Sequence, residues 1–198
     1  IISVINQKGG VGKTTTVINL AAGLAKQEKK ILVIDLDPQG NATTGLGLSN
    51  TDNSSKTIYG VLNGTETILE VIKKTEFKNL DIVTSNVDLS GLEVETAGDN
   101  ERAFILKVKL AAYINDFRGS YDYILIDCPP SLSLLTVMAL VSSNSLLVPL
   151  QTEFFALEGL TQLMKTIERI KVNLNPDLKI RGILLTMYDK RNKLSSQV

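Results

Sequence analysis

The sequence contains no histidine and no tryptophan, and only one of its 198 residues is a cysteine. Without histidine, the chain cannot form the Ser-His-Asp or Cys-His arrangements of common hydrolases, and it lacks the usual ligands of catalytic zinc. A single cysteine excludes a disulfide within the chain and fits a reducing compartment. Phosphoryl chemistry, in which positioning and electrostatics do most of the catalytic work, remains open.

Aromatic residues and long apolar runs are also scarce. Aromatic residues make up 5% of the chain, which argues against a surface that stacks the bases of single-stranded nucleic acid. Basic and acidic residues number 21 each, so net charge predicts no partner and any nucleic-acid site must be a local patch. No apolar run approaches the ~20 residues of a membrane-spanning helix. The first residues also lack the pattern of a signal peptide.

What the sequence does contain is an alternation of apolar strands with helical periodicity. This alternation is typical of a mostly parallel, twisted sheet with helices on both faces, so it predicts a three-layer α/β fold. The expected strands are Ile1–Asn6, Ile31–Asp35, Leu80–Thr84, Tyr123–Asp127, Ser145–Leu150 and Ile180–Met187.

Three helices are predicted from apolar residues at helical spacing. They are expected near Lys13–Gln27, Glu101–Asn115 and Glu158–Asn173. The residues expected to face the core from the second helix are Phe104, Ile105, Val108 and Ala112. The polar stretch Ser49–Lys56 predicts an exposed loop. The chain starts inside a strand without methionine and stops at Ser195–Val198 without a helix-ending signal, so we expect residues 1–198 to be a single domain truncated at its C-terminus.

A glycine-rich stretch, KGGVGKTT, lies between the first expected strand and the first helix. Its backbone N–H groups can close around phosphate oxygens, Lys13 can reach the β- and γ-phosphates, and the Thr14 hydroxyl can bind Mg²⁺. The positive end of the helix dipole points at the same anion. The residues expected at a bound nucleotide are Gly9, Gly10, Val11, Gly12, Lys13, Thr14 and Thr15.

This loop is a variant of the common form G-x-x-x-x-G-K-[ST]. It has Gln7 where that form has glycine, and it carries an additional lysine, Lys8, five residues before Lys13. A lysine beside a glycine turn is often simply solvated, and that alternative stays open for Lys8 taken alone. In this context we expect Lys8 to be a second cation that flanks the phosphates.

Three carboxylates follow expected strands. Asp35 and Asp37 come at the end of the second strand, and Asp127 ends the fourth. In a phosphate-loop protein these strand ends face the ligand crevice. We expect Asp37 to position the attacking water, Asp35 to anchor the strand end, and Asp127 to hold the magnesium shell. For Asp35 or Asp37 alone, an exposed turn before Pro38 is the alternative.

Cys128 begins a Cys-Pro-Pro-Ser segment directly after the last of these carboxylates. Proline fixes φ and removes a donor, so the segment predicts a rigid turn beside the γ-phosphate, and this turn could move when that phosphate is lost. With no histidine and no second cysteine in the chain, Cys128 is expected to fill space rather than to react.

Four blocks of the sequence, in this order, resemble the ParA/Soj family of chromosome- and plasmid-partition ATPases. The blocks are Lys8–Thr15, Asp35–Gly47, Asp127–Leu132 and Pro149–Gly159. The resemblance covers nearly the whole chain. It implies a P-loop NTPase fold with a deviant Walker A motif, hydrolysis of ATP with Mg²⁺, and a homodimer that sandwiches ATP.

The resemblance also implies roles for single residues. In the family, the counterpart of Lys8 crosses to the partner's nucleotide, that of Lys13 holds phosphate, and that of Thr14 binds Mg²⁺. The counterpart of Asp37 supports hydrolysis, and Asp127 matches the aspartate on the magnesium side. The ATP-bound dimer of the family binds DNA without sequence preference, in the cytoplasm and on the nucleoid, and a ParB/Spo0J-like centromere-binding protein stimulates hydrolysis.

Two further features concern the end of the chain. Met187, in the stretch Thr186–Asp189, matches the part of the family that approaches the adenine base. Family members continue past the counterpart of Val198 and contribute basic residues to the DNA surface there. The local cluster Lys190, Arg191 and Lys193 is either the edge of such a surface or a solvated loop.

Three other functions compete with partition. A MinD-like ATPase, which positions cell division at the membrane, shares the loop and Lys8 but carries a C-terminal amphipathic helix, and that end is missing from this sequence. The blocks Cys128–Leu132 and Pro149–Gly159 favour the partition branch, so no membrane contact is expected. An electron carrier like the nitrogenase iron protein needs two cysteines per subunit for its cluster, and this chain has only Cys128. A small-molecule kinase would need an acceptor pocket and would have no evident use for Lys8.

Overall fold

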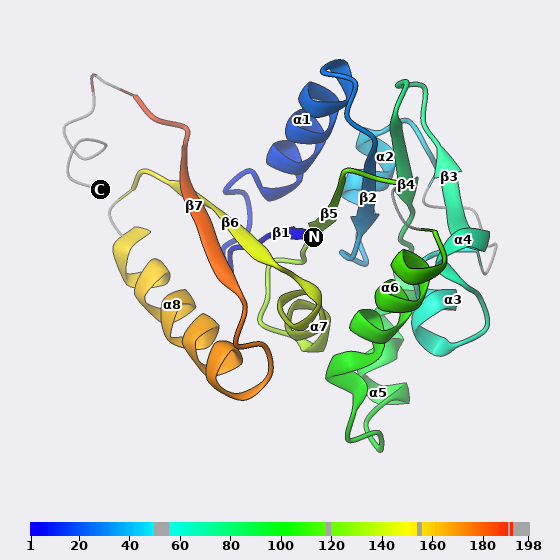
Figure 1. Ribbon diagram of the computed structural model, residues 1–198. Helices are drawn as coiled ribbons and strands as arrows, with labels where there is room; N and C mark the ends of the chain where they lie inside the picture. Colours follow the sequence, from blue (N-terminus) through cyan, green and yellow to red (C-terminus); the bar gives the residue numbers. More distant parts are fainter. Residues whose placement is uncertain (50–55, 118–119, 154–155, 190, 192–198) are drawn as a thin grey trace.

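The computed structural model describes residues 1–49, 56–117, 120–153, 156–189 and 191. Within these residues, seven strands form one sheet in the order β3-β4-β2-β5-β1-β6-β7. All neighbouring strands run parallel except β3 and β4, which are antiparallel. The predicted α/β fold with a mostly parallel sheet is therefore confirmed (Figure 1).

The strands are β1 (Ile2–Val4), β2 (Ile31–Asp35), β3 (Ile72–Lys74), β4 (Leu80–Val83), β5 (Tyr123–Asp127), β6 (Ser145–Gln151) and β7 (Lys179–Thr186). The helices are α1 (Lys13–Lys26), α2 (Asn41–Gly45), α3 (Ile58–Asn63), α4 (Ile68–Val71), α5 (Leu92–Glu95), α6 (Ile105–Asp116), α7 (Leu134–Ser142) and α8 (Ala156–Asn173). Two 3₁₀ turns, Val87–Gly91 and Arg102–Phe104, precede α5 and α6.

Helices cover both faces of the sheet because its central strands are apolar on both sides. In β2, Ile31 and Val33 pack in the same cluster as α1, whereas Leu32 and Ile34 pack with α3, α4, α6 and α7 on the other face. A third cluster joins β6 to α7 and α8. In Figure 1, α1 lies above the sheet, and α7 and α8 lie below it. These are the three layers that the strand and helix pattern predicted.

Parallel pairing brings three loops to one edge of the sheet. Asp35 is in register with Asp127, and Asp127 is in register with Val4. The carboxyl ends of β1, β2 and β5 therefore lie side by side, and each continues into a segment that the sequence marked as functional. Strand ends at such an edge are where open α/β sheets bind ligands.

Several predicted elements agree closely with the structure. The predicted strands Ile31–Asp35 and Tyr123–Asp127 match β2 and β5 at both ends. The first and third predicted helices correspond to α1 and α8. Most of the predicted loop Ser49–Lys56 lies outside the described residues, as do Lys190 and Lys193 of the basic cluster.

The predicted core face of the second helix is half right, because Phe104 and Ile105 pack against core clusters as predicted, whereas Val108 and Ala112 are exposed. Val108 is 62% exposed, and the side chains that α6 buries are Leu106, Leu110 and Tyr113. Apolar residues occur on several sides of α6, so the spacing of its residues alone could not select the buried face.

The strand β3 and the helices α2–α5 and α7 were not predicted. β3 is only three residues long, and α2–α5 are each four to six residues long, too short to show a period. Helix α7 is apolar and buried on nearly all sides, so its sequence has no polar face to reveal the helical period. Within the described part of the chain, no helix is both long and apolar enough to cross a membrane.

Candidate active site

The glycine-rich loop connects β1 to α1 and is shaped by two glycines with positive φ. Gly10 has φ 76° and Gly12 has φ 87°, in the left-handed region that glycine enters at little cost. Helix α1 begins at Lys13, and its N-cap residue Gly12 provides no side-chain cap for the first N–H groups of the helix. These N–H groups are therefore available to an anion held in the loop.

Lys13 lies inside the loop rather than in solvent. Its side chain is largely buried, and its ammonium donates a hydrogen bond to the carbonyl oxygen of Lys8 at 3.0 Å. Burial lowers the pKa of Lys13, while the nearby carboxylates of Asp127 and Asp37 act in the opposite direction. The Lys13 side chain thus crosses the loop that would enclose a phosphate group.

Thr14 and Asp127 meet beside the loop. The hydroxyl of Thr14 donates to Oδ2 of Asp127 at 2.7 Å. Asp127 is fully buried, and its other oxygen, Oδ1, has no hydrogen-bond partner among the described residues. Burial and the neighbouring charge of Asp35 raise the pKa of Asp127 to about 7. A buried carboxylate oxygen without a partner, next to a hydroxyl, fits Mg²⁺, which binds few carboxylates and keeps waters or phosphate oxygens.

The described residues contain no group of three or more His, Cys, Asp or Glu side chains that could hold a metal ion by themselves. A magnesium ion at Thr14 and Asp127 would therefore depend on phosphate oxygens and water for its remaining ligands. This dependence is expected for a metal that binds together with its nucleotide.

The two aspartates at the end of β2, Asp35 and Asp37, differ in their hydrogen bonds. Asp35 is fully buried, and both of its carboxylate oxygens accept hydrogen bonds. Asp37 is also buried, at 6% exposed, and its Oδ1 accepts a hydrogen bond from the backbone N–H of Gln39 at 3.0 Å. Desolvation raises the pKa of Asp35 to about 6. Asp35 is thus placed to hold structure, as the sequence predicted, and Asp37 is the aspartate of the two that can serve a ligand.

Lys8 contacts a residue outside the loop through its ammonium. Its side chain is 51% exposed and forms an ion pair with Glu153, which follows β6. The backbone N–H of Lys8 donates to Asn6 Oδ1, and Asn6 Nδ2 donates in turn to the carbonyl of Pro149 at 2.7 Å. The start of the loop is therefore braced against the end of β6, while the Lys8 ammonium remains accessible.

Met187 lies beside the loop, next to a mainly apolar hollow of about 650 Å³. The hollow is lined by Gly12, Thr15, Thr16, Asn19, Leu20, Leu147, Leu184, Thr186 and Met187. Thr186 donates its hydroxyl hydrogen to the carbonyl of Val11 at 2.9 Å, so the end of β7 is tied to the loop. The structure thus brings the predicted base-contacting stretch to the phosphate loop, with Met187 itself 62% exposed.

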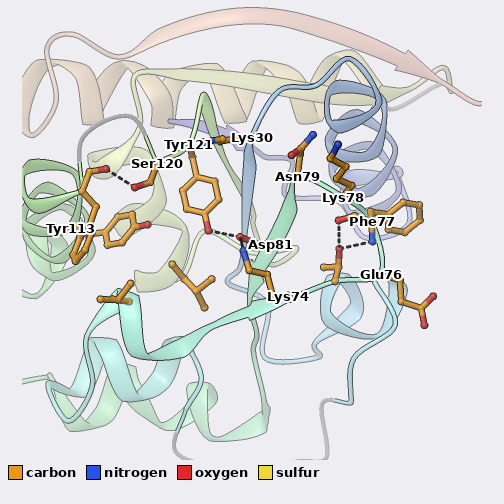
Figure 2. A pocket seen from close by; sticks show the side chains of 14 residues that line it. Lys30, Lys74, Glu76, Phe77, Lys78, Asn79, Asp81, Tyr113, Ser120 and Tyr121 are labelled. Carbon is orange, nitrogen blue, oxygen red and sulfur yellow. Dashed lines mark hydrogen bonds and ion pairs between the residues drawn. The ribbon is translucent and has the colours of Figure 1, made fainter.

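A second hollow, of about 720 Å³, lies at the opposite end of the sheet (Figure 2). Its central carboxylate, Asp81, accepts hydrogen bonds from Lys74 Nζ and Tyr121 Oη, each at 2.7 Å. The polar groups at its centre are therefore paired within the protein. Because this hollow has no glycine-rich backbone comparable to residues 8–15, we assign the active site to the phosphate-loop edge.

Three side chains at this edge had no role predicted from the sequence. They are Asn6, Thr43 and Glu153. Each acts through a partner distant in the sequence, so no local pattern identifies it.

Comparison with known proteins agrees with this geometry. Residues 1–180 match the family model AAA_31, described as an AAA domain. All 198 residues align at 51% identity with the chromosome partitioning protein ParA of Caulobacter vibrioides, of which they cover 73%.

Two solved structures are similar in fold and were obtained with nucleotide. The first is cobyrinic acid a,c-diamide synthase from Mycobacterium smegmatis with bound ATP analogue and magnesium; its TM-score is 0.91 at 38% identity, over 99% of this chain and 78% of that one. The second is a putative plasmid partition protein from Borrelia burgdorferi bound to AMPPNP; its TM-score is 0.79 at 31% identity, over 99% and 77% of the two chains.

Proposed function

The chain belongs to the ParA/Soj family of chromosome and plasmid partition ATPases, and we propose that binding of Mg²⁺·ATP drives two copies to dimerise across the phosphate-loop edge. The observation that carries this proposal is the contrast between the two loop lysines. Lys13 is buried inside the loop, whereas Lys8 lies half exposed on its outer side. Lys13 can bind the chain's own phosphates, and Lys8, whose surface ion pair can exchange, can bind those of a second subunit.

Nucleotide binding in this proposal uses the loop, the buried lysine and the Thr14–Asp127 pair. Backbone N–H groups of residues 9–15 and the Lys13 ammonium hold the phosphates, and the hollow beside Met187 receives the base. Thr14 and Asp127 hold Mg²⁺, which neutralises charge on the β- and γ-phosphates. The partnerless Oδ1 of Asp127 supports this metal assignment.

Asp37 positions the water that attacks the γ-phosphate. It is supported in this role by its place at the carboxyl end of β2 and by the hydrogen bond from Gln39 N–H, which orients its carboxylate. Asp35 is unsuitable because both of its carboxylate oxygens already accept hydrogen bonds. The role acts mainly in the transition state, so it affects turnover more than affinity.

Lys8 supplies positive charge to the partner's nucleotide. In a single subunit its ammonium is paired with Glu153, an exchangeable ion pair at the surface. Phosphate oxygens of a second subunit would offer more negative charge than one carboxylate. We therefore propose that dimerisation moves Lys8 from Glu153 to the opposing phosphates, where it stabilises the charge of the departing γ-phosphoryl group.

The later steps of the proposal follow the family rather than a local geometry. The ATP-bound dimer binds DNA without sequence preference, on the nucleoid, and a ParB/Spo0J-like centromere-binding protein stimulates hydrolysis. Residues 1–198 serve as one ATPase domain in this scheme. Because the net charge of these residues is zero, we expect the strongest phosphate contacts to come from a local cluster of lysine and arginine.

The Mycobacterium smegmatis structure bears the name of an amide-forming enzyme, which suggests a different activity. Partition is favoured because the identity to ParA is higher, 51% against 38%, and because the Borrelia burgdorferi partition protein shares the fold. An ATP-dependent synthase would bind its acid substrate at the same edge and would turn over ATP without DNA.

DNA binding tests this function in the full-length protein. We expect cosedimentation with non-specific duplex DNA in ATP, little in ADP or without nucleotide, and a steep loss as salt rises, because counterions are released from phosphates. A Lys13→Ala variant should bind no DNA in any nucleotide state. DNA binding that is the same with and without ATP would contradict the proposal.

A further inference from the structure

The buried carboxylate of Asp35 accepts hydrogen bonds from both ends of the loop that carries Asp37. Its Oδ1 accepts a hydrogen bond from the backbone N–H of Asp37 at 3.2 Å. Its Oδ2 accepts two from Thr43, one from the backbone N–H and one from the hydroxyl, each at 2.7 Å. All three donors belong to the segment 37–43, so Asp35 closes this segment into a ring.

Thr43 extends this ring to the neighbouring strand. Its hydroxyl oxygen, which donates to Asp35, also accepts a hydrogen bond from the backbone N–H of Ser85 at 3.1 Å. Ser85 comes two residues after β4, and both Thr43 and Ser85 are buried. One hydroxyl therefore joins the start of α2 to the carboxyl ends of β2 and β4.

We propose that Thr43 is a positioning residue for hydrolysis, which fixes the place of the Asp37 carboxylate through its hydrogen bonds to Asp35 and Ser85. This inference rests on the proposed role of Asp37. It assigns Thr43 no contact with nucleotide or water. Thr43 acts by holding the far end of the loop, and Asp35 holds the near end.

Between these two ends the backbone N–H of Gln39 donates to Oδ1 of Asp37, and two backbone hydrogen bonds also hold the loop. The backbone N–H of Leu36 donates to the carbonyl of Asp127, and that of Gly40 donates to the carbonyl of Asp37. Gly40 has φ 65°, so the chain reverses there in a conformation that glycine adopts easily. Without the Thr43 hydroxyl, one end of the ring is held by a single backbone hydrogen bond to a buried charge.

Loss of the Thr43 hydroxyl is expected to destabilise the transition state of hydrolysis more than the ATP-bound ground state. Phosphates are held by residues 8–15 and by the Thr14–Asp127 pair, none of which contacts Thr43 through a described hydrogen bond. A displacement of about 1 Å in a catalytic group can lower a rate by about 10²-fold. Loosening the ring should therefore lower kcat while KM for ATP stays nearly constant.

A purely structural role for Thr43 predicts a different result. If its hydroxyl only compensates the buried charge of Asp35, its loss should lower thermal stability without a specific effect on turnover of the folded enzyme. Steady-state kinetics below the unfolding temperature distinguish the positioning role of Thr43 from the purely structural one. The two roles also differ in whether the effect of a Thr43 substitution on kcat depends on the presence of Asp37.

The test compares Thr43→Val, Thr43→Ser and Thr161→Val in the full-length protein with DNA present. Valine keeps the shape of threonine and removes the hydroxyl, serine restores it, and the exposed Thr161 donates its hydroxyl to the carbonyl of Leu157 within α8, away from this loop. We expect Thr43→Val to lower kcat about 10- to 100-fold with little change in KM, and the other two variants to stay within about 3-fold of the parent. A parental kcat for Thr43→Val, or an equal loss of ATP affinity, would overturn the inference.

A double-mutant cycle with Asp37→Ala distinguishes this inference from its premise. If Thr43 acts through Asp37, adding Thr43→Val to Asp37→Ala causes no further loss of kcat. An additional loss of the full Thr43 effect would refute the inference and leave the role of Asp37 intact. If Asp37→Ala alone turns over ATP at the parental rate, the proposed role of Asp37 is wrong, and the inference about Thr43 is wrong with it. Should Thr43→Val not fold, Thr43→Ala enters the same cycle, after its ATP affinity confirms a folded site.

Discussion

Thr14 and Asp127 form a hydrogen bond of 2.7 Å that uses only one of the two carboxylate oxygens, and the other oxygen is buried without a described partner. The pair comes from two strand ends that the parallel sheet sets next to each other, β1 through its loop and β5 directly. In the protein without ligand, an ionised Asp127 is therefore poorly compensated. This relationship makes the stability of the unliganded protein sensitive to pH.

The first prediction concerns that sensitivity. Asp127 has an ordinary pKa of 3.8 and a folded-state pKa of about 7, raised by burial and then by the charge of Asp35. The folded state thus binds the proton more tightly, so the free energy of unfolding falls as pH rises between these values. We expect the unliganded protein to melt at a higher temperature at pH 6 than at pH 8, with a difference of about 1 kcal/mol from this group.

Asp127→Asn provides the control for the pH effect. The amide cannot ionise, so the variant should be more stable than the parent at pH 8, and its melting temperature should vary less with pH. Asp35, whose pKa is raised to about 6, acts in the same direction, so some dependence of stability on pH should remain in the variant. An unchanged pH dependence in Asp127→Asn would show that another group causes it.

The second prediction concerns Lys13. Its ammonium would contact phosphate in the ground state and the transition state alike, so Lys13→Ala should weaken ATP binding at least about 10-fold in calorimetry. Lys26→Ala, at the exposed end of the same helix, is the matched control and should bind ATP as the parent does. Parental affinity in Lys13→Ala would remove this lysine from the phosphate site.

The third prediction concerns Asp37. Positioning of a water acts in the transition state, so Asp37→Ala should keep its ATP affinity, lose about 10²-fold or more in turnover, and accumulate as a nucleotide-bound dimer. Asp116→Ala, at the exposed end of α6, should hydrolyse ATP normally. Turnover of Asp37→Ala at the parental rate would assign the water to a different residue.

The sequence predicted the parts of the molecule that depend on local patterns. The strands β2 and β5 are apolar runs that end in aspartate, and the loop Lys8–Thr15 is an unbroken motif, so each could be recognised from consecutive residues. Their convergence at one edge followed from the rule that parallel strands end together. The buried face of α6 was only half predicted because apolar residues occur on several of its sides, and α7 was missed because burial on nearly all sides removes its polar face.

The contacts that complete the site could not be predicted in this way. Thr43 meets Ser85 across 42 positions of sequence, and Lys8 meets Glu153 across 145. Threonine and glutamate are common residues on helices and loops, and nothing adjacent to them specifies a distant partner. Only the strand order, which places β4 beside β2 and β6 beside β1, brings these pairs together.

The central claim is that two copies of the chain share an active site through Lys8. A cation supplied in trans accelerates other phosphate-loop enzymes by about 10³–10⁵-fold, and we expect less from lysine because it lacks the planar fork of arginine. Lys8→Ala should still bind ATP, since Lys13 and the loop backbone remain. Lys29→Ala, an exposed lysine before β2, is the matched control.

Light scattering of Lys8→Ala with and without a slowly hydrolysed ATP analogue, paired with its rate of ATP hydrolysis, tests this claim most directly. The parent and Lys29→Ala should double in mass with the analogue and hydrolyse ATP. Lys8→Ala should stay a monomer with the analogue bound and should lose hydrolysis as well. A Lys8→Ala protein that still dimerises and still hydrolyses ATP at the parental rate would contradict the shared active site.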